Sequence, residues 1–146
     1  MRVMGLDVGD RRIGVAVSDE LSLFAQGLLV LERRGLAADL TALSRVISEK
    51  DVSRIVVGMP RNMNGSYGPQ AEKTAAFIKT LEQTCDRPCV AWDERLTTQQ
   101  AERVLIAADQ RRSKRKAVRD KLAAQLILQS YLDYQHLTAK DHPDQA

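Results

Sequence analysis

Three acidic residues from distant parts of the chain are the strongest candidates for chemistry. Asp7 ends a short apolar run, Glu94 closely follows another, and Asp120 lies within a helical pattern near the C-terminus. Carboxylate oxygens are hard ligands, which favour Mg²⁺ or Mn²⁺ over zinc. Two such ions about 4 Å apart can activate a water and stabilise the leaving oxygen of a phosphodiester. We therefore expect Asp7, Glu94 and Asp120 to be catalytic ligands of two ions, with Asp93 as a lesser candidate ligand.

Asp120 is expected on the buried side of its helix. It precedes Ala123, Ala124 and Ile127 by three, four and seven residues, so all four share one helical face. The apolar face continues through Tyr131 and Tyr134, and the polar stripe comprises Lys121, Gln125 and Gln129. A buried carboxylate is costly unless it is paired or binds a metal. Two interpretations stay open: an ion pair or backbone cap near the helix start, or completion of the carboxylate cluster.

Basic side chains crowd into the segment that surrounds Asp120: Arg111, Arg112, Lys114, Arg115, Lys116, Arg119 and Lys121. Dense like charge repels itself unless an anion is nearby, although a solvated loop is the simpler interpretation. Beside a phosphodiester site, such a segment could hold the flanking backbone phosphates. The candidates for nucleic-acid contacts are Arg11, Arg12, Arg95, Arg112, Lys114, Arg115 and Lys116.

The segment from Gly5 to Gly14 is a second candidate for phosphate binding. Glycines around a tight hairpin expose backbone N–H groups, which can bind anions. The alternative is that Gly9 only permits the turn. Many sugar kinases and ATPases begin similarly, so the motif is weak by itself.

The elements that must position these residues alternate between strands and helices. We expect strands over 3–7, 13–17, 27–31, 54–58 and 89–92, and helices over 36–47, 69–83 and 117–135, with a further helix capped by Thr97 or Thr98. This order predicts an α/β fold whose mixed sheet begins with antiparallel hairpin strands and continues with parallel ones. Ligands of such sheets gather beyond the carboxyl ends of the strands, where Asp7 and Glu94 lie. Residues 1–135 form one domain, and 136–146 form a polar tail.

Composition excludes several classes of protein. The 146 residues are 44% hydrophobic and 28% charged with a net charge of +3, which is a globular profile with no stretch as long as a membrane span. No export signal is evident, so the cytoplasm is expected. Cys85 and Cys89 form no CxxC pair and have no histidine nearby, which indicates reduced thiols rather than a zinc site. His136 and His142 fall in the tail, which argues against a Ser-His-Asp triad.

Four segments of the chain resemble one known family. They are DVGDRRIGVAVSD at 7–19, VGMPRNMNG at 57–65, DERLTT at 93–98 and DKLAAQLILQSYL at 120–132. In this order they resemble the YqgF family, also called RuvX, over about residues 2–134. The resemblance implies a ribonuclease-H-like fold related to the RuvC resolvases. It also implies a nuclease that matures the 5′ end of small-subunit ribosomal RNA.

The resemblance assigns roles to individual residues. Asp7, Glu94 and Asp120 fall on the family's metal-binding acids, and the loop from Asn62 to Gly65 is expected to line the site. Asp10 departs from the small hydroxyl residue that the family carries there. An acid at this position could join the site or weaken phosphate binding, and both outcomes stay open.

Four functions are compatible with these residues. The first is a Mg²⁺- or Mn²⁺-dependent nuclease acting on ribosomal RNA precursor, with pre-ribosomal particles as partners and no membrane. The second is a resolvase of branched DNA, which needs a dimer, whereas the first could be a monomer or homodimer. The third is a non-catalytic RNA-binding assembly factor, and the fourth is a sugar kinase or ATPase. The last needs two domains, and this chain has room for one.

Overall fold

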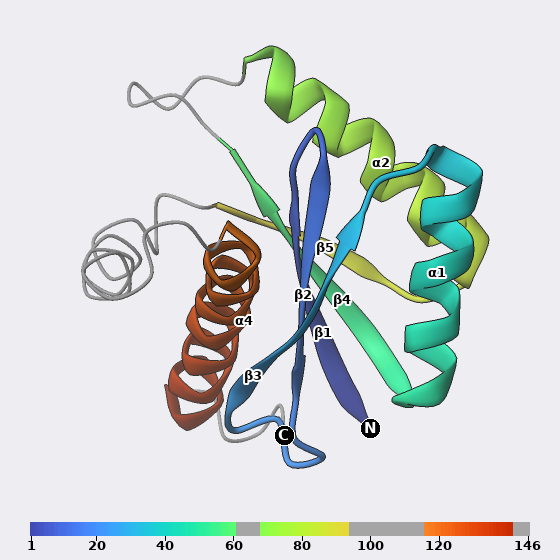
Figure 1. Ribbon diagram of the computed structural model, residues 1–146. Helices are drawn as coiled ribbons and strands as arrows, with labels where there is room; N and C mark the ends of the chain where they lie inside the picture. The colour runs from blue at the N-terminus through green and yellow to red at the C-terminus, as the bar shows by residue number, and fades with distance from the viewer. Residues whose placement is uncertain (61–67, 94–115, 142–146) are drawn as a thin grey trace.

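The computed structural model describes residues 1–60, 68–93 and 116–141, and within the last segment the side chains of 121–138. Three strands come first, followed by helices and strands in alternation (Figure 1). The elements are β1 (Arg2–Val8), β2 (Arg12–Ser18), β3 (Ala25–Glu32), α1 (Leu36–Glu49), β4 (Val52–Met59), α2 (Pro69–Cys85), β5 (Cys89–Asp93) and α4 (Lys116–Asp141). The expected helix after Thr97 or Thr98 lies outside the described residues.

The strands form one mixed sheet in the order β3-β2-β1-β4-β5. β2 is antiparallel to both β1 and β3, whereas β4 is parallel to both β1 and β5. The predicted mixed sheet with an initial hairpin is therefore confirmed. Because β1, β4 and β5 are parallel, their carboxyl ends all lie at one edge of the sheet, the carboxyl edge.

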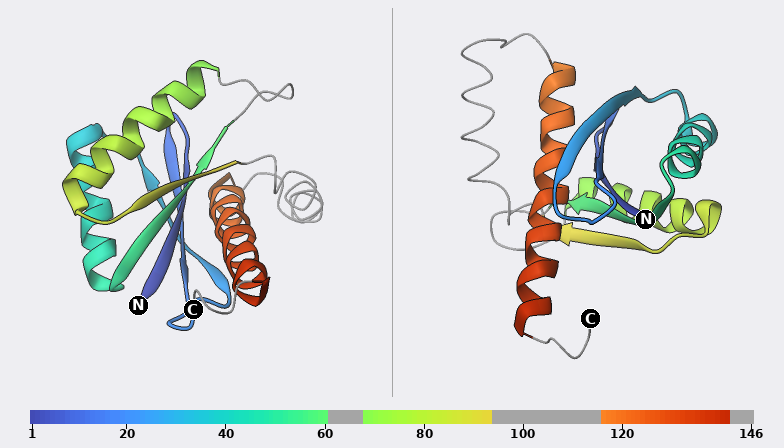
Figure 2. Two further views of the ribbon diagram at one scale, coloured as in Figure 1. Left: turned by 180° about the vertical axis from the view of Figure 1, so that it is seen from behind. Right: turned by 90° about the horizontal axis from the view of Figure 1, so that it is seen from below.

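Helices cover both faces of the sheet: α1 and α2 pack on one, and α4 packs on the other (Figures 1 and 2). The α1/α2 face is lined by large apolar side chains such as Leu6, Val15, Ile55 and Val57, which pack with Leu43 into the main core. The α4 face carries smaller residues, and a second core forms there. The sheet thus separates two cores. The small residues on the α4 face let this helix approach the backbones of the strands closely.

Gly5 in β1 fixes how closely α4 approaches the sheet. A Cβ atom at this position would lie 2.6 Å from Leu128 Cβ and 3.1 Å from the Ala124 carbonyl oxygen. Such separations are too short for any side chain, so α4 rests on the backbone of β1. Gly27 in β3 also faces α4, but there a Cβ would meet its nearest atom, the Lys121 carbonyl oxygen, at 3.4 Å.

Three features of α4 differ from the prediction. The helix continues to Asp141, so it includes the start of the expected tail, where His136 contacts the Ser22 carbonyl oxygen at 2.8 Å. Gln129 was expected on a polar stripe, but its amide accepts from Ala25 N at 2.8 Å and donates to Leu23 O at 3.1 Å. These backbone groups lie where β3 begins and need partners, which the glutamine supplies. Tyr134 was expected on the apolar face, but it is 51% exposed.

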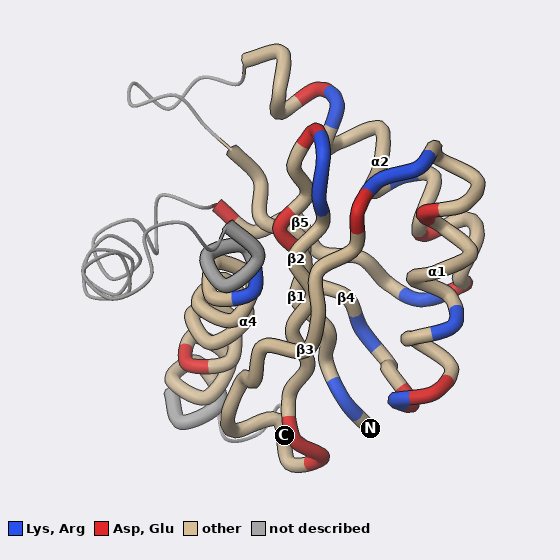
Figure 3. The backbone as a smooth tube through the Cα atoms, viewed as in Figure 1, with Lys and Arg blue, Asp and Glu red and all other residues tan. Residues whose placement is uncertain are grey.

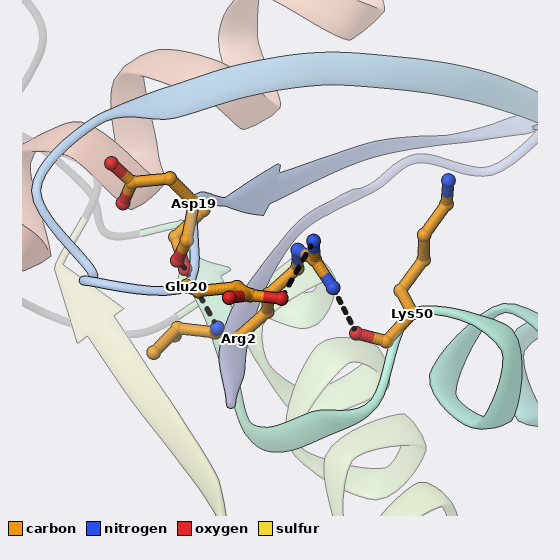
Figure 4. A network of polar contacts seen from close by, with 6 residues as sticks. Arg2, Asp19, Glu20 and Lys50 are labelled. Atoms are coloured by element: carbon orange, nitrogen blue, oxygen red, sulfur yellow. Dashed lines mark hydrogen bonds and ion pairs between the residues drawn. The ribbon is translucent and has the colours of Figure 1, made fainter.

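Polar contacts tie the amino edge of the sheet, which lies opposite the carboxyl edge (Figure 4). Arg2 Nη1 donates to the Lys50 carbonyl oxygen at 3.1 Å, and Arg2 Nη2 lies 3.5 Å from Glu20 Oε1. The Val3 N–H donates to Ser18 Oγ at 2.9 Å. These bonds join β1 to the β2–β3 loop and to the α1–β4 turn, so we assign this edge a structural role.

Among the described helices, none is long and apolar enough to span a membrane.

Arg33 and Asp39 form the most buried ion pair among the described residues. Asp39 is 4% exposed, and its carboxylate accepts from Arg33 Nε and from the Arg34 N–H, each at 3.0 Å. Arg33 also donates to the Gly9 carbonyl oxygen at 3.1 Å, and its guanidinium lies 5.3 Å from the centre of the Phe77 ring. One side chain thus links the β3–α1 connection, the β1–β2 turn and α2.

Replacing Arg33 with methionine is expected to lower the free energy of unfolding by about 2–3 kcal/mol, because it leaves a buried carboxylate without its counter-charge. Urea denaturation followed by circular dichroism measures the change. Arg45→Met is the matched control, because Arg45 is exposed on α1. Equal urea midpoints for the two variants would show that the pair does not stabilise the fold.

Candidate active site

Asp7 lies at the carboxyl edge on the α4 face of the sheet. Its neighbours in sequence, Leu6 and Val8, pack into the core beneath α1 and α2, whereas Gly5 faces α4. Side chains alternate along a strand, so Asp7 shares the face of Gly5. The residue is partly buried, which places a carboxylate at the boundary between the second core and solvent.

Glycines flank Asp7 on both neighbouring strands. Asp7 pairs with Gly14 of β2, and because Leu6 pairs with Val57, the next residue of β4 in register with Asp7 is Gly58. Neither glycine adds a side chain to the α4 face beside the carboxylate. A carboxylate at this position is the donor that a hard divalent ion prefers.

Asp93 ends β5 at the same edge, but on the other face. Val90 and Trp92 pack against the α4 core, and Trp92 Nε1 donates to Ser130 Oγ at 3.2 Å. Alternation places Asp93 on the α1/α2 face, in register with Met59. The structure therefore separates this lesser candidate from Asp7 by a layer of the sheet.

The other two predicted acids are only partly described. Asp120 lies in the second turn of α4, one turn before Ala124, and its side chain is outside the described residues. Glu94 follows β5 and lies outside them entirely, as does the loop from Asn62 to Gly65. Within the described part of the chain, no three His, Cys, Asp or Glu residues gather closely enough to hold a metal ion.

Basic residues lie on two connections at the carboxyl edge, the β1–β2 hairpin and the β3–α1 connection. Arg11 and Arg12 belong to the β1–β2 hairpin, and the Arg33 N–H donates to the Arg11 carbonyl oxygen at 2.8 Å. The pairing of Arg12 with Glu32 therefore places Arg34, which sequence reasoning missed, two residues beyond the partner of Arg12, and basic residues lie on both connections (Figure 3). Antiparallel pairing of the predicted strands at 13–17 and 27–31 could have indicated that Arg34 lies on the connection next to the Arg11–Arg12 hairpin. Arg11 and Arg34 are exposed. Of the other predicted contacts, Arg95, Arg112, Lys114 and Arg115 are outside the described residues, and Lys116 begins α4.

The cysteines lie away from this edge and take no part in the site. Cys85 and Cys89 are free thiols at the end of α2 and the start of β5. Burial, together with Cys85 and the Glu82 carboxylate nearby, raises the pKa of Cys89 from 9.0 to about 12. The Cys89 thiol therefore stays protonated at neutral pH.

Cys89 is expected to resist alkylation in the folded protein. At pH 8.5, iodoacetamide should modify it at least about a hundredfold more slowly than in urea, because only the thiolate reacts and the raised pKa makes it scarce. Mass spectrometry of the Cys89 peptide over time gives both rates. Comparable rates in folded and unfolded protein would contradict the raised pKa.

Solved structures with a similar chain path define the fold class. Thermus thermophilus RuvC in complex with a Holliday junction substrate superposes with a TM-score of 0.64 at 16% identity, covering 94% of this chain and 96% of that one. The fowlpox virus resolvase with Holliday junction DNA gives 0.58 at 13% identity, covering 92% and 99%. The fold is thus the ribonuclease-H-like fold of RuvC-type resolvases.

The sequence defines the family within this class. Residues 1–134 match the family described as RuvX, Holliday junction resolvase, and the chain belongs to that family. A relative from Halothermothrix orenii is 56% identical over 136 residues, covering 93% of this chain and 97% of its own. One from Heliobacterium modesticaldum is 54% identical over 142 residues, covering 97% and 95%. Both carry the name "Putative pre-16S rRNA nuclease".

Proposed function

We propose that this protein is a metal-dependent nuclease that hydrolyses phosphodiester bonds in the 5′-end maturation of pre-16S ribosomal RNA, in the cytoplasm. Asp7, Glu94 and Asp120 hold Mg²⁺ or Mn²⁺ at the carboxyl edge. The observation that carries the proposal is the position of Asp7: a partly buried carboxylate on the α4 face, with glycines on both neighbouring strands. The names of the relatives support the choice of substrate.

The packing of α4 supports the inclusion of Asp120. Gly5 contacts α4 at Ala124 and Leu128. The helix runs opposite to β1, because Tyr131 lies nearer the amino edge, where its hydroxyl accepts from Arg54 at 2.7 Å. From Gly5 to Asp7 the strand advances about 6.6 Å, and one helical turn advances about 5.4 Å. The turn that precedes Ala124 therefore runs beside Asp7, and Asp120 belongs to it.

Strand alternation supports Glu94 over Asp93. Val90 and Trp92 point to the α4 face and Asp93 points away from it. The residue that follows Asp93 is thus the better candidate for a site shared with Asp7.

The charges of the site suit a polyanionic strand. Carboxylates alone would repel phosphate, and bound divalent ions would reverse that sign and supply an activated water. Arg11 and Arg34, both exposed beside the β1–β2 turn, can contact backbone phosphates on either side of the cleaved bond. The acids thus hold the ions, and the arginines position the strand.

Resolution of branched DNA is the second candidate. The family description and the two Holliday junction complexes favour it, although those complexes are only 13–16% identical and therefore establish the fold alone. Symmetric cleavage of a junction requires a dimer, whereas cleavage of one RNA strand does not. A protein that stays monomeric in light scattering, both alone and with a four-way junction, would contradict the resolvase, whereas a dimer is compatible with both functions.

Cleavage by the purified protein is the test. We expect Mn²⁺ or Mg²⁺ to support hydrolysis of a precursor RNA spanning the 5′ end of 16S rRNA, and excess EDTA to abolish it. A four-way DNA junction and a duplex of matched length serve as parallel substrates. Cleavage that persists in EDTA would contradict the metal site. Tight, salt-dependent RNA binding without cleavage in any metal would favour the non-catalytic assembly factor.

A further inference from the structure

A pocket lies on the α1/α2 side of the carboxyl edge, separate from the face that carries Asp7. It has a volume of about 360 Å³, and its lining residues come from α2, the start of α1 and the β1–β2 turn. Its lining residues are Val8, Asp10, Arg33, Leu36, Gln70, Lys73, Thr74, Ala76, Phe77 and Thr80. Pockets of this size are typical of sites for small organic groups.

The walls of this pocket suit a flat, uncharged ring with polar edges. Val8, Leu36, Ala76 and Phe77 give apolar surface, and Leu36 is 48% exposed at the rim. Gln70 and the threonines on α2 add polar groups beside that surface. A nucleobase combines one apolar face with hydrogen-bonding edges, which matches this lining.

The charges of the pocket disfavour a phosphate as the occupant. Arg33 already pairs with Asp39 at 3.0 Å and donates to the Gly9 carbonyl oxygen. Lys73 Nζ lies 3.8 Å from Asp10 Oδ1, so these two exposed side chains balance each other. Both cations on the pocket thus have a carboxylate partner, and a neutral base needs no further counter-charge.

The pocket adjoins the candidate active site through the chain itself. Val8 and Asp10 line it, and Asp7 precedes them, so the pocket rim at Asp10 is three residues further along the chain than the acid. Three residues span at most about 11 Å. A strand held at Asp7 could therefore turn over the β1–β2 hairpin and place a nearby base in the pocket, with its phosphates at Arg11 and Arg34.

We propose that the pocket beneath the β1–β2 turn binds one extruded base of the nucleic-acid strand, a few nucleotides from the bond cleaved at Asp7. This inference rests on the proposed function, because it takes the strand to be the substrate. It gives Asp10 a place at the rim of the base pocket, where its carboxylate lies 3.8 Å from Lys73 Nζ.

Filling the pocket tests the proposal with a matched control. Ala76 and Ala75 are both exposed on α2, but only Ala76 lines the pocket. Ala76→Trp and Ala75→Trp therefore carry the same change, and only the first obstructs the base. Binding is measured by fluorescence anisotropy with a single-stranded precursor RNA in the Asp7→Asn background, so that no substrate is lost to cleavage. We expect Ala76→Trp to weaken binding about tenfold and Ala75→Trp less than twofold.

A set of abasic oligonucleotides identifies the base. With the pocket open, removal of one particular base should weaken binding about tenfold, and in Ala76→Trp that same removal should change nothing further. The proposal would be overturned if removal of the base weakens binding equally with the pocket open and in Ala76→Trp. Equal binding by Ala76→Trp and Ala75→Trp would also overturn it. The proposal would also be overturned if free nucleoside monophosphates bind in the pocket but Ala76→Trp leaves binding of the RNA strand unchanged.

Cleavage by the corresponding variants with Asp7 intact separates the two proposals. If cleavage depends on the metal but Ala76→Trp changes neither RNA binding nor cleavage, the base-pocket proposal would be overturned and the nuclease proposal would stand. If removal of the base weakens binding only when the pocket is open, but the protein cleaves no substrate, the base pocket would be supported and the nuclease proposal overturned.

Discussion

Asp7→Asn is expected to lower the rate of phosphodiester cleavage by about a thousandfold or more, while the protein stays folded and still binds RNA. Asparagine keeps the size of the side chain but removes the charge that holds a divalent ion. Such an ion contributes several kcal/mol of transition-state stabilisation, and each 1.4 kcal/mol corresponds to a factor of ten. Single-turnover cleavage with saturating Mn²⁺ measures the loss, and anisotropy measures RNA binding.

Asp51→Asn is the control for this substitution. Asp51 lies in the α1–β4 turn at the amino edge and has a positive φ of 53°, a conformation that asparagine tolerates well. The same change of charge there should leave cleavage within about twofold of the unmodified protein. Full activity in Asp7→Asn, or an equal loss in both variants, would contradict the assigned role of Asp7.

Gly5→Ala is expected to be the most damaging single-methyl substitution of the described residues. The added Cβ would lie 2.6 Å from Leu128 Cβ, and both atoms are fixed to backbone, so α4 must move away from β1. Overpacking of this kind costs about 1–3 kcal/mol. Because the N-terminal turns of α4 carry Asp120, a shift of about 1 Å should also lower cleavage about a hundredfold.

Gly27→Ala separates the steric effect from the general effect of replacing glycine. Gly27 faces the same helix, but its new Cβ would make ordinary contacts, the nearest at 3.4 Å. Urea midpoints and cleavage rates, the latter measured at a temperature where both variants are fully folded, give the comparison. Equal destabilisation by the two substitutions would show that α4 is not seated against β1 as described.

Much of the architecture could be predicted because local patterns decide it. The Val- and Ile-rich runs gave strands within a few residues of β1, β2 and β4, and Pro69 marked the start of α2 as expected. The alternation of strands and helices then required parallel neighbours, and Asp7 was placed correctly at a strand end. These features depend on spacing along the chain, which the sequence displays directly.

Features that depend on packing between distant segments could not be predicted. Alternation within β5 puts Asp93 opposite Val90 and Trp92, but only the packing of those two side chains against α4 decides which face of the sheet Asp93 takes. Gln129 looked like a surface residue because nothing in its own helix reveals that the start of β3 needs its amide. The pocket at Ala76 is likewise assembled from α1, α2 and the hairpin, and its lining residues are far apart in the sequence.

A crystal structure with Mn²⁺, with the ions located by anomalous scattering, tests the shared metal site most directly. We expect one or two ions at the carboxyl edge, with an oxygen of Asp7 about 2.1 Å from an ion that Asp120 or Glu94 also contacts. A second ion should lie about 4 Å from the first. Ions bound elsewhere, or an Asp7 carboxylate that shares no ion with either of the other two acids, would contradict the account.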